Sequence, residues 1–352
     1  MRSSLCCSNG PGVSVKTPQE GAGDRRVFLG FSSSRPGKTA RLRLFVGRCL
    51  AATLTTVTVL GAVAAVQGCR WSEPGHVVRR TVVFEGITRS YLLFCPPEAK
   101  PAPALVFNLH GYGSSAAQQM HYSAMNAVAD TAGFIVVYPE AVEARWNSGI
   151  SDGPGWPTPD VDDVAFISAL IDTLHRARGV DLSRVYVCGM SNGGFMSLRI
   201  ACRLGDRIAA AASVTGVISR RTAGSCTAQR AVPVLLVHGT DDRTVPHDGA
   251  PGWLSADATA RFWAGLHGAV RGDTASIADS DPSDGSTVVR ISYRDSSDEE
   301  TVVFLKVVGG GHAWPRSGLE LPGLGVTNRD ISASEEIWRF FRARRMPPSA
   351  SP

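Results

Sequence analysis

VYVCGMSNGGF, at residues 185–195, is the stretch that decides the fold of this chain. An apolar run typical of a buried β-strand leads into Gly-x-Ser-x-Gly and continues directly into a helical period. Ser191 is therefore expected on a tight strand-to-helix turn, where Gly189 and Gly193 lack the Cβ atoms that would clash. The helix starts beside Ser191, so its N–H groups and positive dipole end face any oxyanion formed there. We predict that Ser191 is a nucleophile rather than part of an ordinary glycine-rich turn.

Strand-like runs and helical periods alternate on both sides of this segment. Runs rich in β-branched and aromatic residues are at 76–84, 90–95, 104–109, 134–138, 184–188, 208–214, 232–237, 288–293 and 302–308. Helical periods are at 115–132, 164–176, 195–204, 256–266 and 334–344, with Asp162 and Ser334 as expected N-caps. Early strands form hairpins and later strands alternate with helices, which is typical of a sheet that is parallel in its middle. We predict one α/β domain over residues 70–346, with helices on both faces and a polar surface loop at 275–287.

A second apolar run delivers a carboxylate. A serine hydroxyl is a poor nucleophile until a base takes its proton, and that base is commonly oriented by an acid. The stretch VLLVHGTDDRTVP, at 234–246, is a strand followed by a turn with two acids. Asp242 matches a Gly-x-x-Asp-x-x-Val-Pro spacing and is the expected acid, with Asp241 as the alternative. Both acids could instead order the turn.

Three histidines follow Asp242 in the chain, and one of them suits the base. His247 is too near Asp242 along the chain to fold back easily, and His267 ends a helical period. His312 follows a strand-like run and three glycines, which free the backbone to bring the imidazole over Ser191. The order Ser191, Asp242, His312 is the order of a nucleophile, acid and base on this kind of sheet. We predict that His312 accepts the Ser191 proton and returns it to the leaving group, rather than serving as a structural loop histidine.

An oxyanion needs a second backbone donor. The run FNLHGYG, at 107–113, is a strand that ends in His-Gly, where such a donor is expected. We predict that the N–H groups of Tyr112 and Asn192 form the oxyanion hole. The alternative is a plain glycine turn in which His110 is a packing residue.

The charge is unevenly distributed along the chain. Its 352 residues carry a net charge of +5, but residues 1–68 alone carry nine Lys or Arg and two Asp or Glu. The remaining 284 residues are therefore slightly acidic, which disfavours nucleic-acid binding, because that function needs a basic face on the folded domain. Residues 1–40 are rich in Gly, Ser, Pro and Arg and are expected to be disordered, as is the tail at 347–352.

Residues 41–69 have the pattern of a secretory signal. Three arginines precede an uncharged run that ends Val-Gln-Gly-Cys69, which resembles the lipobox of bacterial lipoproteins. We predict lipidation at Cys69, with simple secretion or a retained membrane anchor as alternatives. All three place the domain outside the cytoplasm. Initiation near Val46 would leave a conventional signal.

The cysteines agree with export. Cys202 and Cys226 bracket one strand-and-loop unit and are the expected disulfide, which an oxidising compartment allows. Cys95 and Cys188 lie in apolar runs and are expected in the core. The spacing matches no zinc pattern, and we expect neither a metal nor another cofactor.

Several segments together resemble the polyhydroxybutyrate depolymerase and feruloyl esterase family of secreted α/β-hydrolases, including the LpqC-like lipoprotein esterases. The resemblance extends over about residues 78–342. It depends on LHGYGSS (109–115), YPEA (138–141), WNSG (146–149), VDDVAFISALID (161–172), DLSRVYVCGMSNGGFMS (181–197), VPVLLVHGTDDRTVP (232–246) and GGGHAWP (309–315). It implies the α/β-hydrolase fold, and Ser191, Asp242 and His312 correspond to the family's catalytic triad. Trp146, Asn147 and Trp314 match elements near the family's substrate pocket, although the two tryptophans could equally be packing residues.

The resemblance implies a secreted or lipid-anchored serine carboxylic-ester hydrolase that forms an acyl-enzyme. Its expected substrate is a small or oligomeric ester, its expected contact with a membrane is limited to the anchor or signal segment, and no nucleic acid is expected. A feruloyl or acetylxylan type of esterase and an extracytoplasmic acyltransferase with the same triad remain alternatives. A peptidase or a non-catalytic binding protein is less consistent with these motifs.

Overall fold

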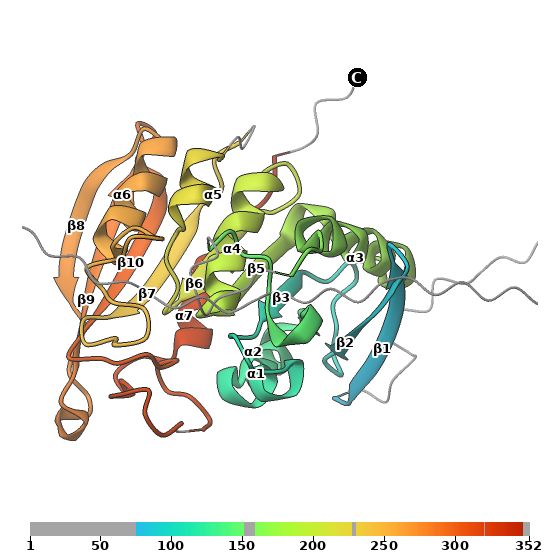
Figure 1. The fold of residues 1–352 in the computed structure, drawn as a ribbon, viewed down its shortest axis with the longest axis horizontal. Coiled ribbons are helices and arrows are strands. Elements are labelled where there is room, and N and C mark those ends of the chain that lie inside the picture. Colours follow the sequence, from blue (N-terminus) through green and yellow to red (C-terminus); the bar gives the residue numbers. More distant parts are fainter. Residues whose placement is uncertain (1–74, 151–158, 227–229, 320, 348–352) are drawn as a thin grey trace, which may run out of the picture. The chain divides into compact units, whose positions relative to one another are not determined.

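A mixed sheet of ten strands crosses the part of the chain that this computed structural model describes, residues 75–150, 159–226, 230–319 and 321–347 (Figure 1). The strands are β1 (Val77–Phe84), β2 (Ile87–Phe94), β3 (Leu105–Leu109), β4 (Ile135–Pro139), β5 (Val185–Met190), β6 (Ala210–Val214), β7 (Val234–Gly239), β8 (Val270–Ser276), β9 (Thr287–Arg294) and β10 (Glu300–Val308). Their order in the sheet is β1-β2-β4-β3-β5-β6-β7-β10-β9-β8. The six strands from β4 to β10 in this order are parallel, and antiparallel strands flank them on both sides.

Helices cover both faces of the sheet (Figure 1). They are α1 (Ala116–Ser123), α2 (Met125–Ala132), α3 (Asp163–Arg178), α4 (Asn192–Arg203), α5 (Arg220–Gly224), α6 (Ala256–Leu266) and α7 (Ala333–Arg342), with short 3₁₀ turns at Val142–Ala144, Leu182–Arg184 and Pro282–Asp284. One core cluster joins the sheet to α3, α4 and α6, and a second joins the opposite face to α1, α2 and α7. The predicted α/β-hydrolase architecture is confirmed.

The central strands are buried along their whole length. Every residue of β3, β4, β5, β6 and β7 is buried, because helices shield both faces and the strands are continuous apolar runs. Strand β1 alternates between exposed and half-buried residues, and every residue of the edge strand β8 is exposed. All of the parallel strands therefore end at one edge of the sheet, where loops can carry side chains toward one another.

Two local expectations about helices were wrong. The period predicted as one helix at 115–132 is split into α1 and α2 at Ala124, whose φ of 51° lies in the left-handed region. Asp162 caps α3 as expected and accepts a hydrogen bond from the Ala165 N–H. The N-cap of α7 is Ser332 rather than Ser334, because Ser334 lies inside the helix and its hydroxyl bonds other segments.

A disulfide joins Cys202, near the end of α4, to Cys226, just after α5. Cys95 and Cys188 are buried, as expected, and burial raises the pKa of Cys188. Within the described ranges, no helix has both the length and the apolar character needed to span a bilayer. The expectations for residues 1–40, for the signal at 41–69 with Cys69, and for the last five residues lie outside the described part of the chain.

Candidate active site

Ser191 occupies the turn between β5 and α4, and its backbone is strained. Its φ of 53° and ψ of −119° lie in a region that residues with a Cβ rarely adopt. Such a conformation costs about 1–3 kcal/mol and persists only where the surroundings enforce it. Here the Ser191 N–H donates to the Val214 carbonyl at 2.9 Å, and the Ser191 carbonyl accepts the Phe195 N–H at 2.9 Å. The strained turn is thus fixed to both β6 and α4.

The two glycines around Ser191 allow the chain to pack at this density. A Cβ on Gly189 would lie 2.5 Å from the Gly193 carbonyl oxygen. A Cβ on Gly193 would overlap the carbonyl groups of Leu109 and His110. The first turn of α4 therefore packs directly on the end of β3, as the sequence predicted from these glycines.

Asp242 and His312 form a buried pair. His312 Nδ1 lies 2.7 Å from Asp242 Oδ2, and each residue is 4% exposed. The other carboxylate oxygen, Oδ1, accepts the N–H groups of Thr244 at 2.9 Å and Val245 at 2.8 Å. These bonds fix the carboxylate, which in turn favours the tautomer with hydrogen on Nδ1 and a lone pair on Nε2. Asp241, the alternative acid, is exposed and accepts a bond from Thr240 Oγ1.

Backbone hydrogen bonds position the loop that carries His312. The His312 N–H donates to the Leu324 carbonyl at 2.6 Å, and the Gly311 N–H donates to the Val326 carbonyl at 2.8 Å. The Asp241 N–H donates to the Gly310 carbonyl at 2.9 Å, which ties this loop to the turn that carries the acid. The Asp242–His312 pair therefore does not depend on side-chain contact alone.

Strand order brings Ser191 to the same sheet edge as this pair. Ser191 follows β5, Asp242 follows β7 and His312 follows β10, and these strands are parallel. The His312 loop also reaches α1, because the Trp314 N–H donates to Tyr122 Oη at 3.2 Å. The hydrogen bonds of the described residues include the one from His312 to Asp242 but none between Ser191 Oγ and His312. A link of that kind often tightens only when substrate is bound.

The expected oxyanion hole lies against Ser191. A Cβ on Gly111 would be 3.5 Å from Ser191 Cβ, so the Gly111–Tyr112 peptide is adjacent to the nucleophile. Asn192 is the first residue of α4, where backbone N–H groups have no partner within the helix. The Tyr112 side chain is 45% exposed, consistent with a role through its backbone.

His110 supports this loop, a role that the sequence did not reveal. The Ala141 N–H donates to His110 Nε2 at 3.1 Å, and His110 Nδ1 lies 2.7 Å from the Gly111 carbonyl oxygen. Burial lowers the pKa of His110, although the bond to Gly111 and the Glu140 carboxylate act in the opposite direction. The imidazole is fully buried. The only sequence signal was a histidine directly before the glycine at a strand end.

The residues matched to a substrate pocket, Trp146, Asn147 and Trp314, all make hydrogen bonds within the protein, and both tryptophans are buried, which favours the packing alternative for them. Trp146 is 2% exposed, its Nε1–H donates to the His110 carbonyl at 3.0 Å, and its N–H donates to Asn192 Oδ1 at 2.7 Å. Trp314 is completely buried, and its Nε1–H donates to Ser334 Oγ at 3.2 Å. Both tryptophans therefore pack in the interior.

Asn147 is also fully engaged within the protein. Its side-chain amide donates to the Val161 carbonyl at 2.9 Å and accepts from Arg199 Nη1 at 2.9 Å. Its backbone N–H donates to Asp163 Oδ2 at 2.8 Å. The loop at 146–149 is thus a structural brace beside the nucleophile.

A buried ion pair holds this brace, and no local pattern in the sequence indicates it. Arg89 Nη2 lies 2.7 Å from Asp163 Oδ1, and both side chains are almost completely buried. The guanidinium also lies over the Phe166 ring at 3.9 Å. Burial raises the pKa of Asp163, while the Asn147 N–H and Arg89 act to lower it.

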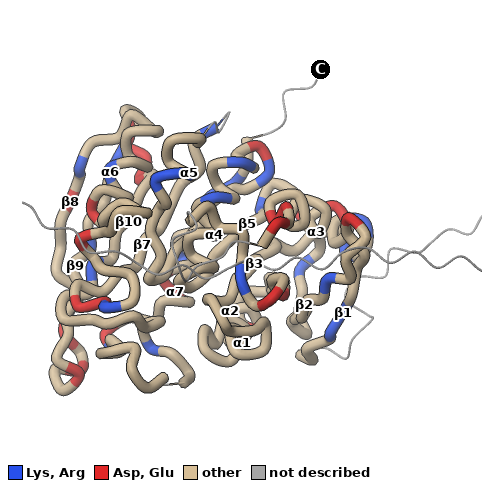
Figure 2. The backbone as a smooth tube through the Cα atoms, viewed as in Figure 1, with Lys and Arg blue, Asp and Glu red and all other residues tan. Residues whose placement is uncertain are grey.

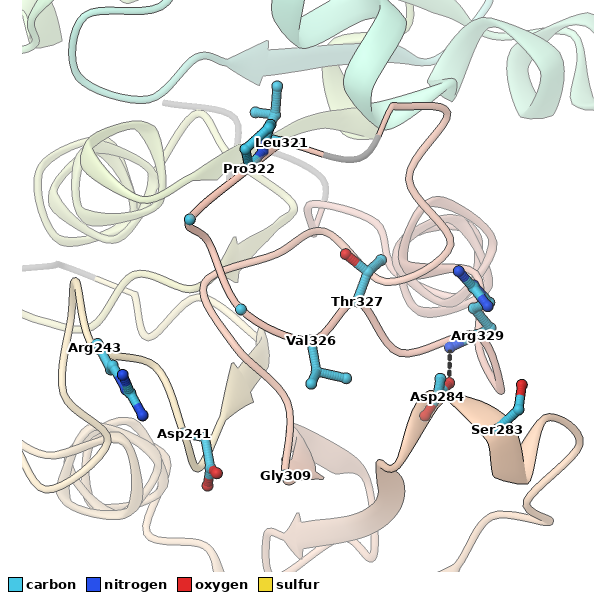
Figure 3. Close-up of a pocket in the computed structure, with 12 residues that line it drawn as sticks. Asp241, Arg243, Ser283, Asp284, Gly309, Leu321, Pro322, Val326, Thr327 and Arg329 are labelled. Atoms are coloured by element: carbon cyan, nitrogen blue, oxygen red, sulfur yellow. Dashed lines mark hydrogen bonds between the residues drawn. The ribbon is translucent and has the colours of Figure 1, made fainter.

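A cavity of about 890 Å³ lies beside the loops that carry the acid and the base. Figure 3 shows Asp241 and Arg243 on one side and Asp284 and Arg329 on the other, with Val326 and Thr327 between them. Its wall includes Gly309, close in sequence to His312, and Val326, whose carbonyl holds the His312 loop. The cavity thus has several charged and hydroxyl side chains in its wall, but Asp242 and His312 themselves do not line it. Within the described ranges, no three His, Cys, Asp or Glu side chains are grouped to hold a metal ion.

Comparisons with known proteins find esterases. The family model described as esterase PHB depolymerase matches residues 89–260. A protein of Nocardia uniformis subsp. tsuyamanensis, NocK, which is named as an esterase, is 32% identical over 282 residues, covering 74% of this chain and 81% of NocK. The bifunctional acetylxylan esterase/xylanase XynS20E of Neocallimastix patriciarum is 30% identical over 170 residues, or 48% of this chain and 24% of that enzyme.

A solved structure supports the fold. The acetyl xylan esterase from Aspergillus awamori superposes with a TM-score of 0.53 at 15% identity, covering 75% of this chain and 99% of that one. The match to most of NocK, together with the matched family model, identifies the family. Relatives of the chain also include proteins named as feruloyl esterase, acetylxylan esterase and poly(3-hydroxyalkanoate) depolymerase. The chain is an esterase and belongs to the PHB depolymerase esterase family.

Proposed function

We propose that this esterase is a serine carboxylic-ester hydrolase in which Ser191, His312 and Asp242 act as a catalytic triad through an acyl-enzyme. The observation that carries the proposal is the 2.7 Å bond between His312 Nδ1 and Asp242 Oδ2, at the sheet edge where Ser191 is held in strained backbone. A carboxylate fixed by two backbone N–H groups leaves His312 Nε2 available to act as a base.

The reaction proceeds in two halves. In the first, Ser191 Oγ attacks the ester carbonyl carbon while its proton passes to His312 Nε2. The carbonyl oxygen becomes an oxyanion that the Tyr112 and Asn192 N–H groups stabilise. The carbon–oxygen bond of the ester then breaks, and the leaving alcohol takes the proton from His312. In the second half, water gives a proton to His312 and its oxygen attacks the acyl carbon. The bond from that carbon to Ser191 Oγ then breaks, His312 returns the proton to Ser191 Oγ, and the acid is released.

The cavity beside His312 suggests which part of the ester is recognised there. Because His312 returns its proton to the alcohol, the alcohol lies on the His312 side of the nucleophile. The cavity beside the His312 loop is lined by charged and hydroxyl side chains, including Arg243, Asp284 and Thr327, although no residue of the proposed triad lines it. Such a lining suits the hydroxyl groups of an oligomeric or sugar-like alcohol better than a purely apolar chain. This favours a feruloyl or acetylxylan type of ester over a crystalline polyester.

We also propose that the enzyme acts outside the cytoplasm, anchored by a lipid on Cys69. The basic residues before an uncharged run and the Val-Gln-Gly-Cys69 ending support this. The disulfide between Cys202 and Cys226 agrees with an oxidising compartment. Mass spectrometry of the mature protein tests it: a diacylglyceryl group on an N-terminal Cys69 is expected, and a cleaved but unmodified terminus would contradict it.

The hydrolase proposal is tested with the wild type and Ser191→Ala on p-nitrophenyl acyl esters, 3-hydroxybutyrate oligomers and methyl ferulate. We expect turnover by the wild type, a loss of about 10⁴-fold or more in Ser191→Ala, and fluorophosphonate labelling of Ser191 alone. Ser114→Ala, at an exposure similar to that of Ser191, is the control and should keep full activity. Turnover that persists in Ser191→Ala would contradict the proposal. Transfer of the acyl group to added alcohols in preference to water would favour the acyltransferase instead.

A further inference from the structure

A second cavity lies at the sheet edge opposite the candidate active site. Its volume is about 450 Å³, and four cationic residues line it, Lys100, Arg184, Arg342 and Arg345. Arg184 directly precedes β5, whereas Ser191 directly follows that strand. A strand of six residues spans about 20 Å, so the full length of β5 separates the cavity from Ser191. The cavity is therefore not part of the ester site.

The cavity has a clear excess of positive charge. Arg184 Nε lies 2.7 Å and Arg345 Nη1 lies 3.1 Å from the carboxylate of Asp181. Burial alone would raise the pKa of Asp181, but hydrogen bonds from Ser183 and Arg184 lower it to about 2, so this carboxylate is ionised. Lys100 and Arg342 make no hydrogen bond or ion pair with the described residues. Figure 2 shows basic and acidic residues interspersed over the described backbone. The lining of this cavity differs, because it contains four cationic residues and no acidic one.

An aromatic side chain adds to the cationic lining. Trp338 lines the same cavity, stacks on Phe134 at 4.1 Å and is half-buried. Tryptophan beside Lys and Arg is a combination that suits the boundary between lipid headgroups and water. The C-terminal ends of α2 and α7 carry the negative ends of the helix dipoles and slightly stabilise nearby cations. This accounts for cations at these helix ends but does not account for a cavity lined by four of them.

The chain enters the domain on this same edge. The Gly75 N–H donates to the Cys95 carbonyl at 3.3 Å, and Cys95 follows the end of β2, where Phe94 pairs with Val136 at the start of β4. Lys100 lies five residues beyond Cys95 in the following loop. Five residues lie between Cys69 and Gly75, so a lipid on Cys69 would be held within about 20 Å of Gly75. An anchored domain would thus present this edge to the bilayer.

The charge on the rest of the edge limits which part of it can approach an anionic surface. Asp295, Asp298 and Glu299 form the turn between β9 and β10, at the start of β10. In the sheet, β10 is three strands from β5, which is about 15 Å. Anionic lipid would repel this acidic turn and attract the cavity. Contact is therefore favoured on the β3 and β5 side, next to the point where the chain enters.

We propose that the cavity and its four cations bind anionic phospholipid headgroups, so that the domain lies on the bilayer by its amino edge with Ser191 directed away from it. This inference rests on the proposed lipid anchor at Cys69 and on no feature of the ester site. Each basic residue near an anionic membrane surface adds to binding, and the effect is lost at high salt. The orientation leaves the candidate active site open to substrates outside the membrane.

The test measures co-sedimentation of the full chain with vesicles. The vesicles are phosphatidylcholine alone or an equal mixture of phosphatidylcholine and phosphatidylglycerol. The variants are Lys100→Glu/Arg342→Glu and its neutral form Lys100→Gln/Arg342→Gln. The matched control is Arg221→Glu/Arg261→Glu, which makes the same charge change on exposed positions of α5 and α6. Turnover of p-nitrophenyl acetate without vesicles is measured on every sample.

We expect the wild type to bind the anionic vesicles. The partition coefficient of the Lys100→Glu/Arg342→Glu variant should be lower by about tenfold or more. The Gln variant should be intermediate, and the control should stay within about twofold of the wild type. Equal losses in the control, unchanged binding of both cavity variants, or equal binding to both kinds of vesicle would overturn the proposal. Binding of inorganic phosphate in calorimetry without vesicle binding would also overturn it, in favour of a small-anion site. Turnover reports separately on the esterase: wild type without turnover contradicts the proposed function and leaves the vesicle result valid.

Discussion

His110 Nδ1 lies 2.7 Å from the carbonyl oxygen of Gly111, the residue that follows it. Because the Ala141 N–H donates to His110 Nε2, the imidazole carries its hydrogen on Nδ1 and donates it to that carbonyl. In a trans peptide the C=O and the next N–H point in opposite directions. Fixing the Gly111 carbonyl therefore also fixes the direction of the Tyr112 N–H, which we propose as a donor to the oxyanion. His110 is a positioning residue for the oxyanion hole.

We expect His110→Ala to lower kcat for ester hydrolysis by about 10- to 100-fold with little change in KM, because the donor is needed chiefly in the transition state. Steady-state kinetics on p-nitrophenyl acetate measure both constants. His110→Asn can still donate from the position of Nδ1 and should recover part of kcat. A rise in KM with unchanged kcat in His110→Ala would show that the residue acts on substrate binding instead.

The two adjacent acids give a sharp comparison for the triad. We expect Asp242→Asn to lower kcat by about 10⁴-fold, because an amide at this position favours the wrong tautomer of His312. Asp241→Asn makes the same chemical change on an exposed side chain and should stay close to wild-type activity. The measurement is kcat for both variants at one pH, with unfolding curves to confirm that both are folded. A large loss in Asp241→Asn and a small one in Asp242→Asn would reverse the assignment.

The central fold could be predicted because its signal is local. The strands β3 to β7 are buried on both faces, so each is a continuous apolar run that stands out in the sequence. Strand β8 was not predicted, because all of its residues are exposed and it has no apolar alternation. The break at Ala124 was also missed, because alanine carries no signal for a left-handed conformation.

In the candidate site too, some residues have a local sequence signal and others do not. Ser191, Asp242 and His312 each follow an apolar strand within a glycine-containing motif, so each has a signal of its own. For Trp146 and Trp314 the sequence left a pocket and a core position equally open, because an aromatic residue in a loop gives the same pattern in both. Contacts between distant residues leave no local pattern at all, and the brace that holds the loop at 146–149 is of this kind.

The pair Arg89 and Asp163, 74 residues apart, tests that brace. Asp163→Asn leaves the Arg89 guanidinium buried without its carboxylate, which should destabilise the fold by about 3–5 kcal/mol. Urea unfolding followed by circular dichroism measures the change. The neighbouring Asp162→Asn keeps a side chain that caps helices well and should cost less than about 0.5 kcal/mol. Equal effects of the two substitutions would mean that Asp163 serves only as part of the helix start.

His238 should make folding stability depend on pH. Its Nε2 lies 2.9 Å from the Val245 carbonyl oxygen and 3.6 Å from Asp242 Oδ2, and its Nδ1 is buried with no hydrogen-bond partner in the described part of the chain. Burial lowers the pKa of His238 to about 4, against the opposing effect of Asp242. The unfolded chain takes up a proton near its ordinary pKa of about 6.5, whereas the folded protein does so only near pH 4. Between these values the unfolded state binds more protons, so stability is full above about pH 6.5 and falls as the pH drops toward 4.

His238→Gln removes this titration and keeps a donor that can reach the Val245 carbonyl. The wild type should therefore lose on the order of 3 kcal/mol more stability than His238→Gln between pH 7 and pH 4. Urea unfolding at several pH values measures the difference, and His110 and His312, which are also buried, are the same in both proteins. Parallel stability curves for the wild type and His238→Gln would show that His238 takes up its proton at the same pH in the folded and the unfolded state. The buried Nδ1 would then carry a hydrogen in the folded protein and would need a partner close enough to accept it.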